Sequence, residues 1–174
     1  MNGRGGKVDI VDYDLDWPQQ FAQLAARIQS ILGPLLLSVK HVGSTAVPGL
    51  AAKPVIDINL VVANSREEHA YAPKLQDAGF ALTVREPNWF EHRMFEHQAP
   101  RANLHVFSSG CPEIERMRLF RDWLCHSSED RALYARVKRN LAIQNWTHIQ
   151  DYADAKQAVI AQIMTRASAW GTAR

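Results

Sequence analysis

Two short apolar runs joined by a segment of small residues constrain this chain more than any other feature. The first run covers Leu35 to Val42 and the second covers Val55 to Val62. Both have the length of a strand, and the second is rich in β-branched residues. Because the second run is apolar almost throughout, we expect a central strand with both faces covered. The fold is therefore predicted to be built around a sheet with these two strands inside it.

The segments around these strands show further helix and strand patterns. Apolar residues at helical spacing predict a helix over 17–32, which Asp16 can cap and which Gly33 ends. Ser65 and Glu68 match a capping box, so a second helix is expected from Ser65 to Gly79. Other strands are predicted near 80–85, 89–97 and 103–108, and other helices after 112, 127 and 151.

The order of these elements decides the fold class. Helices do not alternate regularly with the strands, so the fold is not doubly wound. We predict an α+β (α/β) fold with a mixed sheet of about five strands and a helical C-terminal part. Residues 1–7 are rich in glycine and are expected to be a disordered tail, followed by one domain over 8–170.

Composition excludes several classes of function. The net charge of +2 is too small to indicate nucleic acid as a partner. The longest apolar run is far shorter than a membrane span, so no membrane partner is expected. The two cysteines, Cys111 and Cys125, have no metal-binding spacing and are expected to be reduced thiols. These features predict a cytoplasmic protein; they do not indicate its oligomeric state.

The turn between the two central strands has the composition of a phosphate-binding loop. Gly43, Ser44 and Thr45 offer backbone N–H groups and hydroxyl groups to a ligand. On the following strand Asp57 and Asn59 are two positions apart and therefore share a face. Hard oxygen donors of this kind bind Mg²⁺, so both are candidate metal ligands. The pattern favours a nucleoside triphosphate with a divalent metal ion.

Phosphoryl chemistry also needs positive charge over the phosphates and a group that can move a proton. Lys53, Arg93 and Lys138 are the candidates for phosphate binding, and Lys156 is a further cation in the C-terminal part. His105 lies in a predicted strand and is the candidate base. Lys138 and Lys156 fall on predicted helices, so the ordinary alternative for both is a side chain on a solvated helix face.

Several segments of the chain together resemble the GrpB family, whose domains are described as nucleotidyltransferase-like. Related domains occur fused to dephospho-CoA kinases. The resemblance covers about Val8 to Ala167. It is carried by the segments His41–Pro54, Asn103–Val106, Leu119–Leu124, Tyr134–Lys138 and Tyr152–Lys156 and by the strand that contains Asp57.

The resemblance implies a polymerase-β-like nucleotidyltransferase fold. Carried over, Gly43 and Ser44 match its Gly-Ser pair and Asp57 matches its first metal-binding carboxylate. The second carboxylate position holds Asn59, a departure that argues against two-metal catalysis. Asn103 stands where the family often has histidine.

Two functions from different classes follow. One is a Mg²⁺-dependent nucleotidyltransferase that moves a nucleotidyl group from an NTP to a small acceptor, with Asp57 and His105 as catalytic residues. The alternative is a non-catalytic accessory domain that binds a nucleotide or the phosphates of a coenzyme-A-like compound. Metal-dependent turnover distinguishes the first from the second.

Overall fold

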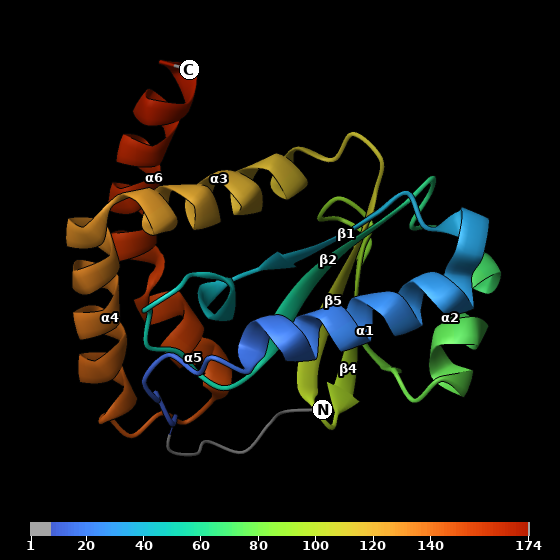
Figure 1. Cartoon of the computed structure of the whole chain (residues 1–174), viewed down its shortest axis with the longest axis horizontal. Coiled ribbons are helices and arrows are strands. Elements are labelled where there is room, and N and C mark those ends of the chain that lie inside the picture. Colours follow the sequence, from blue (N-terminus) through green and yellow to red (C-terminus); the bar gives the residue numbers. More distant parts are fainter. Residues whose placement is uncertain (1–7, 174) are drawn as a thin grey trace.

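The computed structural model describes residues 8–173, so the predicted tail over 1–7 lies outside the described residues. Helices precede, interrupt and follow one five-stranded sheet (Figure 1). In chain order the elements are α1 (Trp17–Leu32), η1 (Gly33–Leu35), β1 (Ser38–Val42), η2 (Ser44–Ala46), β2 (Ile56–Val62), α2 (Glu68–Asp77), β3 (Ala81–Glu86), β4 (His92–Gln98), β5 (Arg101–Ser108), α3 (Pro112–His126), α4 (Ser128–Ala142), α5 (Ile149–Ala155) and α6 (Gln157–Thr172).

The sheet has the strand order β1-β2-β5-β4-β3 and is mixed. β2 and β5 run parallel, and the other neighbouring pairs are antiparallel. The register of the parallel pair sets Asp57 beside Asn103 and Asn59 beside His105. Since paired residues in neighbouring strands point to the same side of a sheet, these four polar side chains share one face.

The opposite face of the sheet carries the main hydrophobic core. Ile56, Ile58 and Leu60 on β2 are buried there against α1 and α2, which lie across this face in Figure 1. α1 begins with Pro18 in its first turn and ends at Gly33, where φ is 52°. The alternation along β2 therefore separates an apolar core side from a polar side.

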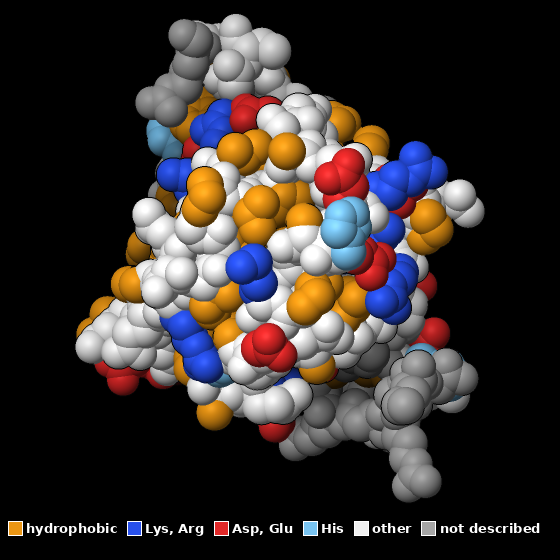
Figure 2. Space-filling model, turned by 90° about the vertical axis from the view of Figure 1, so that its right-hand side faces the viewer, with side chains coloured by type: hydrophobic (Ala, Val, Ile, Leu, Met, Phe, Trp, Pro, Cys, Tyr) orange, Lys and Arg blue, Asp and Glu red, His pale blue; other side chains and the backbone are white. Residues whose placement is uncertain are grey.

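A second core attaches the C-terminal helices to the turn between β1 and β2. Val47 and Leu50 from this turn are fully buried against Leu124, Tyr134 and Ile163 of α3, α4 and α6. Among the described residues, no helix is long and apolar enough to cross a bilayer. Figure 2 shows the side that lies at the right in Figure 1, where basic and acidic side chains are interspersed and form no continuous basic area.

The start of α2 differs from the predicted capping box. Ser65 is fully buried and its hydroxyl donates to the backbone carbonyl of Glu91, while α2 begins only at Glu68. The Asp16 cap is also wrong, since its side chain makes no capping hydrogen bond. The first turn of α4 is capped by Ser127, whose Oγ accepts from the Asp130 N–H at 3.2 Å.

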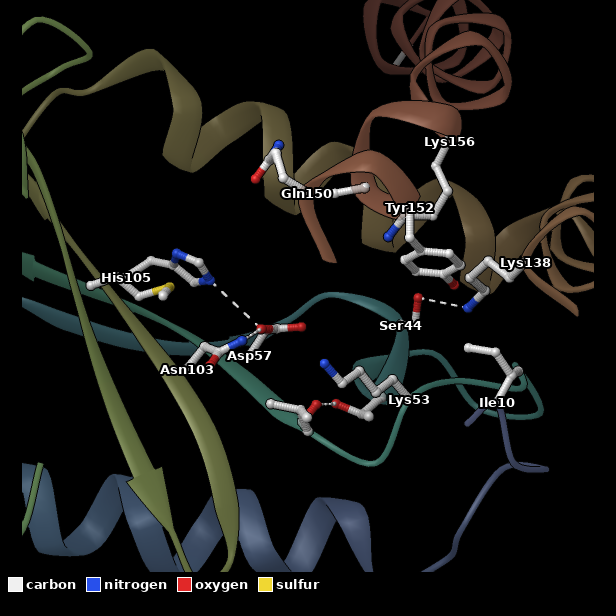
Figure 3. A pocket seen from close by; sticks show the side chains of 14 residues that line it. Ile10, Ser44, Lys53, Asp57, Asn103, His105, Lys138, Gln150, Tyr152 and Lys156 are labelled. Atoms are coloured by element: carbon white, nitrogen blue, oxygen red, sulfur yellow. Dashed lines mark hydrogen bonds and ion pairs between the residues drawn. The ribbon is translucent and has the colours of Figure 1, made fainter. Parts of the chain in front are cut away.

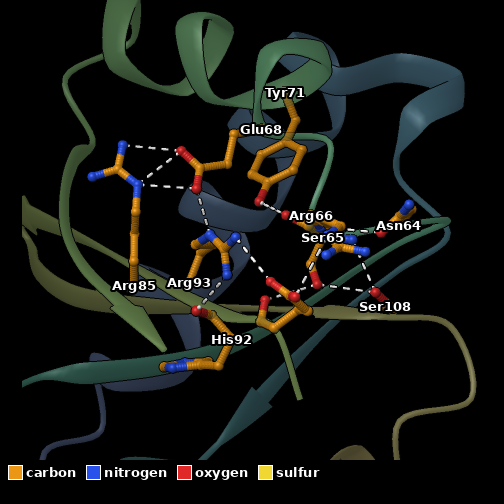
Figure 4. Close-up of polar contacts among 10 residues, drawn as sticks. Asn64, Ser65, Arg66, Glu68, Tyr71, Arg85, His92, Arg93 and Ser108 are labelled. Carbon is orange, nitrogen blue, oxygen red and sulfur yellow. Dashed lines mark hydrogen bonds and ion pairs between the residues drawn. The ribbon is translucent and has the colours of Figure 1, made fainter. Parts of the chain in front are cut away.

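Arg93 lies on the core side of the sheet, away from the polar side that carries Asp57. The Arg93 side chain is 7% exposed, and it donates to Glu68 Oε1 at 2.5 Å (Figure 4) and to Glu91 Oε2 at 3.1 Å. These carboxylates raise its pKa against the effect of burial. The assignment of Arg93 to phosphate binding is corrected, because this side chain is enclosed by carboxylates under α2.

Replacing Arg93 by alanine should lower the free energy of unfolding by about 3 kcal/mol, because it removes a buried side chain and the buried cation that joins Glu68 to Glu91. Arg85 pairs with the same Glu68 but its side chain is 59% exposed, so Arg85→Ala should change stability by less than about 1 kcal/mol. Urea unfolding of the two variants measures both values. Equal losses would contradict a structural role specific to Arg93.

Candidate functional site

A cavity of about 460 Å³ lies between the polar side of the sheet and the C-terminal helices (Figure 3). The sheet contributes one wall through β2, β4 and β5, and α4, α5 and the residue after α5 form the other. The lining residues that carry polar or charged groups are Ser44, Thr45, Lys53, Asp57, Asn103, His105, Lys138, Gln150, Tyr152 and Lys156.

The turn at Gly43 passes directly over the carboxylate of Asp57. Gly43 has φ 71°, in the region that disfavours side chains, and a Cβ built there would lie 2.6 Å from Asp57 Oδ2. No residue but glycine fits this approach without displacing the carboxylate. The structure therefore brings the predicted turn and the predicted carboxylate together at one wall of the cavity.

Ser44 is joined to the helical part of the chain by Lys138. The ammonium of Lys138 donates to Ser44 Oγ at 2.8 Å and to the Ala51 carbonyl at 2.5 Å. It also lies 4.6 Å from the centre of the Tyr134 ring, a cation–π contact. Lys138 is 3% exposed, and burial, followed by the nearby charges of Lys156 and Arg139, lowers its pKa to about 7.

Two further lysines face the same cavity. Lys156 lies 4.6 Å from the centre of the Tyr152 ring, and burial lowers its pKa although Asp57 acts in the opposite direction. Burial also lowers the pKa of Lys53, assisted by the charge of Arg101. Lys156 and Tyr152 lie within a segment that resembles the GrpB pattern, and this was the sequence signal for them.

Thr45 lines the cavity, but its hydroxyl is already engaged. It donates to the Val55 carbonyl at 3.2 Å, and it accepts from Nε2 of His41 at 2.9 Å. Burial lowers the pKa of His41 to about 4, so its ring is neutral, and it stacks on Phe21. The role of Thr45 in this structure is to fix the turn, although phosphate contact had been predicted for it.

Asp57 has two polar neighbours on β5. Nδ2 of Asn103 donates to Asp57 Oδ1 at 3.1 Å, and Nε2 of His105 lies 3.6 Å from the same oxygen. These are the side chains that the parallel register sets beside β2. Asn103 and His105 thus hold and flank Asp57 from the neighbouring strand β5.

The oxygen donors fit one metal ion better than two. Asp57 faces the cavity, but Asn59 is 1% exposed and does not line it. Asn59 Oδ1 is buried without a hydrogen-bond partner, the state of an atom that a cation or water would satisfy. The carboxylate of Glu91 does not serve as a further metal ligand, because it pairs with Arg93 and Arg66. Within the described residues no three His, Cys, Asp or Glu side chains form a group able to hold a metal.

The arrangement of helices and strands is a nucleotidyltransferase-like fold. The predicted α+β class with a polymerase-β-like nucleotidyltransferase fold is confirmed. At low identity the fold is shared with a solved GLD-2/RNP-8 complex, with a TM-score of 0.55 at 16% identity over 74% of this chain and 54% of that chain. This likeness concerns the fold alone.

The chain belongs to the GrpB family, whose family description, GrpB protein, matches residues 7–166. A UPF0157 protein of Halalkalibacterium halodurans is 52% identical over 169 residues, which are 97% of this chain and 87% of that protein. The crystal structure of the conserved protein GrpB from Enterococcus faecalis has a TM-score of 0.79 at 27% identity, covering 91% of this chain and 96% of that one.

A longer relative carries a functional name. A dephospho-CoA kinase of Mycolicibacterium paratuberculosis is 29% identical over 190 residues, covering 94% of this chain but 46% of that protein. The chain thus spans about half of the kinase that it matches. The predicted link to dephospho-CoA kinases is confirmed as a similarity of sequence.

Gly43→Ala should destabilise the protein more than Gly49→Ala, although both residues have φ above 70°. A Cβ at Gly49 has no atom within 4 Å, so alanine there costs only backbone strain of about 1 kcal/mol. Alanine at Gly43 adds the collision with Asp57, so we expect an additional loss of about 1–3 kcal/mol. Urea unfolding of both variants compares them. A loss no larger than that of Gly49→Ala would show that the turn does not press on the carboxylate.

Proposed function

We propose that the cavity binds the phosphates of a nucleotide. The observation that carries this proposal is the convergence of three lysines, Lys53, Lys138 and Lys156, on a cavity in which Asp57 is the one carboxylate among the described lining residues. A ligand with several negative charges complements this arrangement, and an ammonium close to a phosphate oxygen contributes up to about 4 kcal/mol at an effective dielectric constant of about 20.

The protonation of the lysines supports an anionic ligand. Burial lowers the pKa of Lys53, Lys138 and Lys156, because the cavity lacks enough negative charge to compensate for the loss of water. A bound phosphate supplies that charge. Lys138 is already oriented by Ser44 and by the Ala51 carbonyl, so little side-chain entropy is lost when it binds.

The size and walls of the cavity suit a nucleotide. Its volume of about 460 Å³ falls within the range of small-molecule sites. Ile10, Val55, Met94 and the ring of Tyr152 provide apolar surface beside the charged groups. The kinase relatives, which by their name act on dephospho-CoA, are compatible with a ligand that carries phosphate.

Affinity for inorganic tripolyphosphate should fall as the pH rises above 7. In the free protein Lys138 loses its proton near its lowered pKa of about 7, while bound phosphate favours the charged ammonium and raises that pKa. Binding must then take up a proton, so affinity should fall by up to about tenfold per pH unit between about pH 7.5 and 9.5. Isothermal titration calorimetry across this range measures the slope.

Lys138→Met should weaken tripolyphosphate binding near neutral pH and flatten its dependence on pH. Lys74→Met is the matched control, because Lys74 is an exposed lysine on α2, outside the cavity. Unchanged affinity in Lys138→Met, or an equal change in both variants, would contradict phosphate binding at this site.

A second candidate function is Mg²⁺-dependent nucleotidyl transfer, as the resemblance implied. It is favoured by the contact between the Gly43 turn and Asp57 and by the unpartnered Oδ1 of Asn59. Asp57 would hold one Mg²⁺, with Asn59 below it on β2. The ion would stabilise charge on the transferred phosphate. Lys138 and Lys156 would bind the leaving phosphates, and His105 would accept a proton from the acceptor hydroxyl.

Asp57→Asn should change ATP binding in opposite directions with and without metal. In EDTA the variant should bind ATP more tightly, because it removes the carboxylate that repels phosphate. With Mg²⁺ the wild-type protein should gain at least about tenfold in affinity and the variant should not, because a bound cation requires the carboxylate. Calorimetry in the two buffers measures both effects. If Mg²⁺ has the same effect on both proteins, metal-dependent transfer at Asp57 is contradicted.

A further inference from the structure

Four side chains form a row that leads from the protein surface to the cavity. Glu86 Oε2 on β3 lies 2.7 Å from Nδ1 of His92 on β4, whose Nε2 lies 3.1 Å from Nδ1 of His105 on β5. Nε2 of His105 faces Asp57 Oδ1 at 3.6 Å. The Glu86 side chain is 47% exposed and His92 is 4% exposed, so the row runs along the polar side of the sheet from an exposed carboxylate past a buried ring.

The direction of the first two hydrogen bonds follows from their partners. An ionised carboxylate only accepts, so the contact with Glu86 requires a proton on Nδ1 of His92. A neutral imidazole carries one proton, which leaves Nε2 of His92 as an acceptor. His105 must then donate from its own Nδ1.

These donor and acceptor roles determine which ring nitrogen His105 presents to the cavity. With its proton on Nδ1, its Nε2 is a bare acceptor beside the carboxylate oxygen of Asp57. The distance of 3.6 Å is longer than an ordinary hydrogen bond, as expected for two acceptors that face each other. Burial, followed by the charge of His105, lowers the pKa of His92, which favours the neutral ring that this row requires.

We propose that Nε2 of His105 and Oδ1 of Asp57 form a subsite for a hydrogen-bond donor of the ligand, and that Glu86 and His92 are its positioning residues. The donor is a hydroxyl or amino group. This inference rests on the proposed function, in which the lysines bind the phosphate end of the ligand. Figure 3 shows Lys138 and Lys156 across the cavity from His105. The ligand is thus a phosphorylated compound with a free hydroxyl or amino group, as the ribose of a nucleotide provides.

Nitrogen-15 NMR of the histidine rings in the ligand-free protein tests the proton positions directly. The spectrum is recorded near pH 8.5, above the ordinary histidine pKa of about 6.5, and His105 is identified by the loss of its signals in His105→Gln. We expect the His105 proton on Nδ1. A proton on Nε2 in the wild-type protein would overturn the proposed subsite.

Glu86→Ala should reverse the direction of the hydrogen bonds along this row. Without Glu86 the one carboxylate left in the row is Asp57, which favours a proton on Nε2 of His105. The Nδ1 atom of His105 then accepts, so His92 carries its proton on Nε2. Asp77→Ala is the control, since Asp77 is an exposed carboxylate near the other end of β3. It should leave the His105 proton on Nδ1. An unchanged His105 tautomer in Glu86→Ala would show that Glu86 has no positioning role.

Ligand binding gives a second readout on the same variant. Glu86→Ala should weaken binding of ATP by about three- to tenfold, the effect of one lost hydrogen bond. Inorganic tripolyphosphate has no ribose hydroxyl and should bind both proteins equally. An equal loss for both ligands, or no loss for ATP, would contradict the donor subsite. Absence of tripolyphosphate binding to the wild-type protein would instead overturn the proposed function, whatever the NMR result.

Discussion

The site depends on a buried ammonium that joins two distant parts of the chain. Lys138 on α4 donates to Ser44 and to the Ala51 carbonyl, both in the segment between β1 and β2. Neutral oxygens compensate for burial of a charge less well than a carboxylate does. The lowered pKa of Lys138 reflects this deficit. The same contact that holds the helical part against the turn therefore prepares the cavity for an anion.

Both faces of β2 contribute to this arrangement, but in different ways. Its apolar residues bury the core side against α1 and α2, and this packing fixes the strand. Asp57 on the other side is fixed from above by Gly43 and from the side by Asn103. A rigid strand thus positions one carboxylate at the wall of a cavity that otherwise carries positive charge.

The fold could be predicted from the sequence because its signals are local. Strand-length apolar runs, the helical spacing of apolar residues in α1 and the Gly33 stop of this helix each act within a few residues. The capping box at Ser65 failed for a physical reason: Ser108, 43 residues away, takes part in the hydrogen bonds of the buried Ser65 hydroxyl. A short pattern cannot reveal such a competing partner.

The candidate site could be predicted only in part. The small-residue turn before an apolar strand, together with the resemblance, predicted that Gly43, Ser44 and Asp57 lie together, and the structure places them so. Charge type alone suggested Arg93, whose side chain points to the other face because alternation along β4 puts it beside Phe95 in the core. The row from Glu86 to His105 depends on the pairing of β3, β4 and β5, which the order of residues does not reveal.

A crystal structure with a non-hydrolysable ATP analogue tests the central claim, that the lysine-lined cavity is a nucleotide phosphate site, most directly. The account predicts phosphate oxygens within hydrogen-bond distance of Ser44 Oγ and of the ammonium groups of Lys138 and Lys156. Phosphates bound at another surface, with this cavity holding only water, would contradict it.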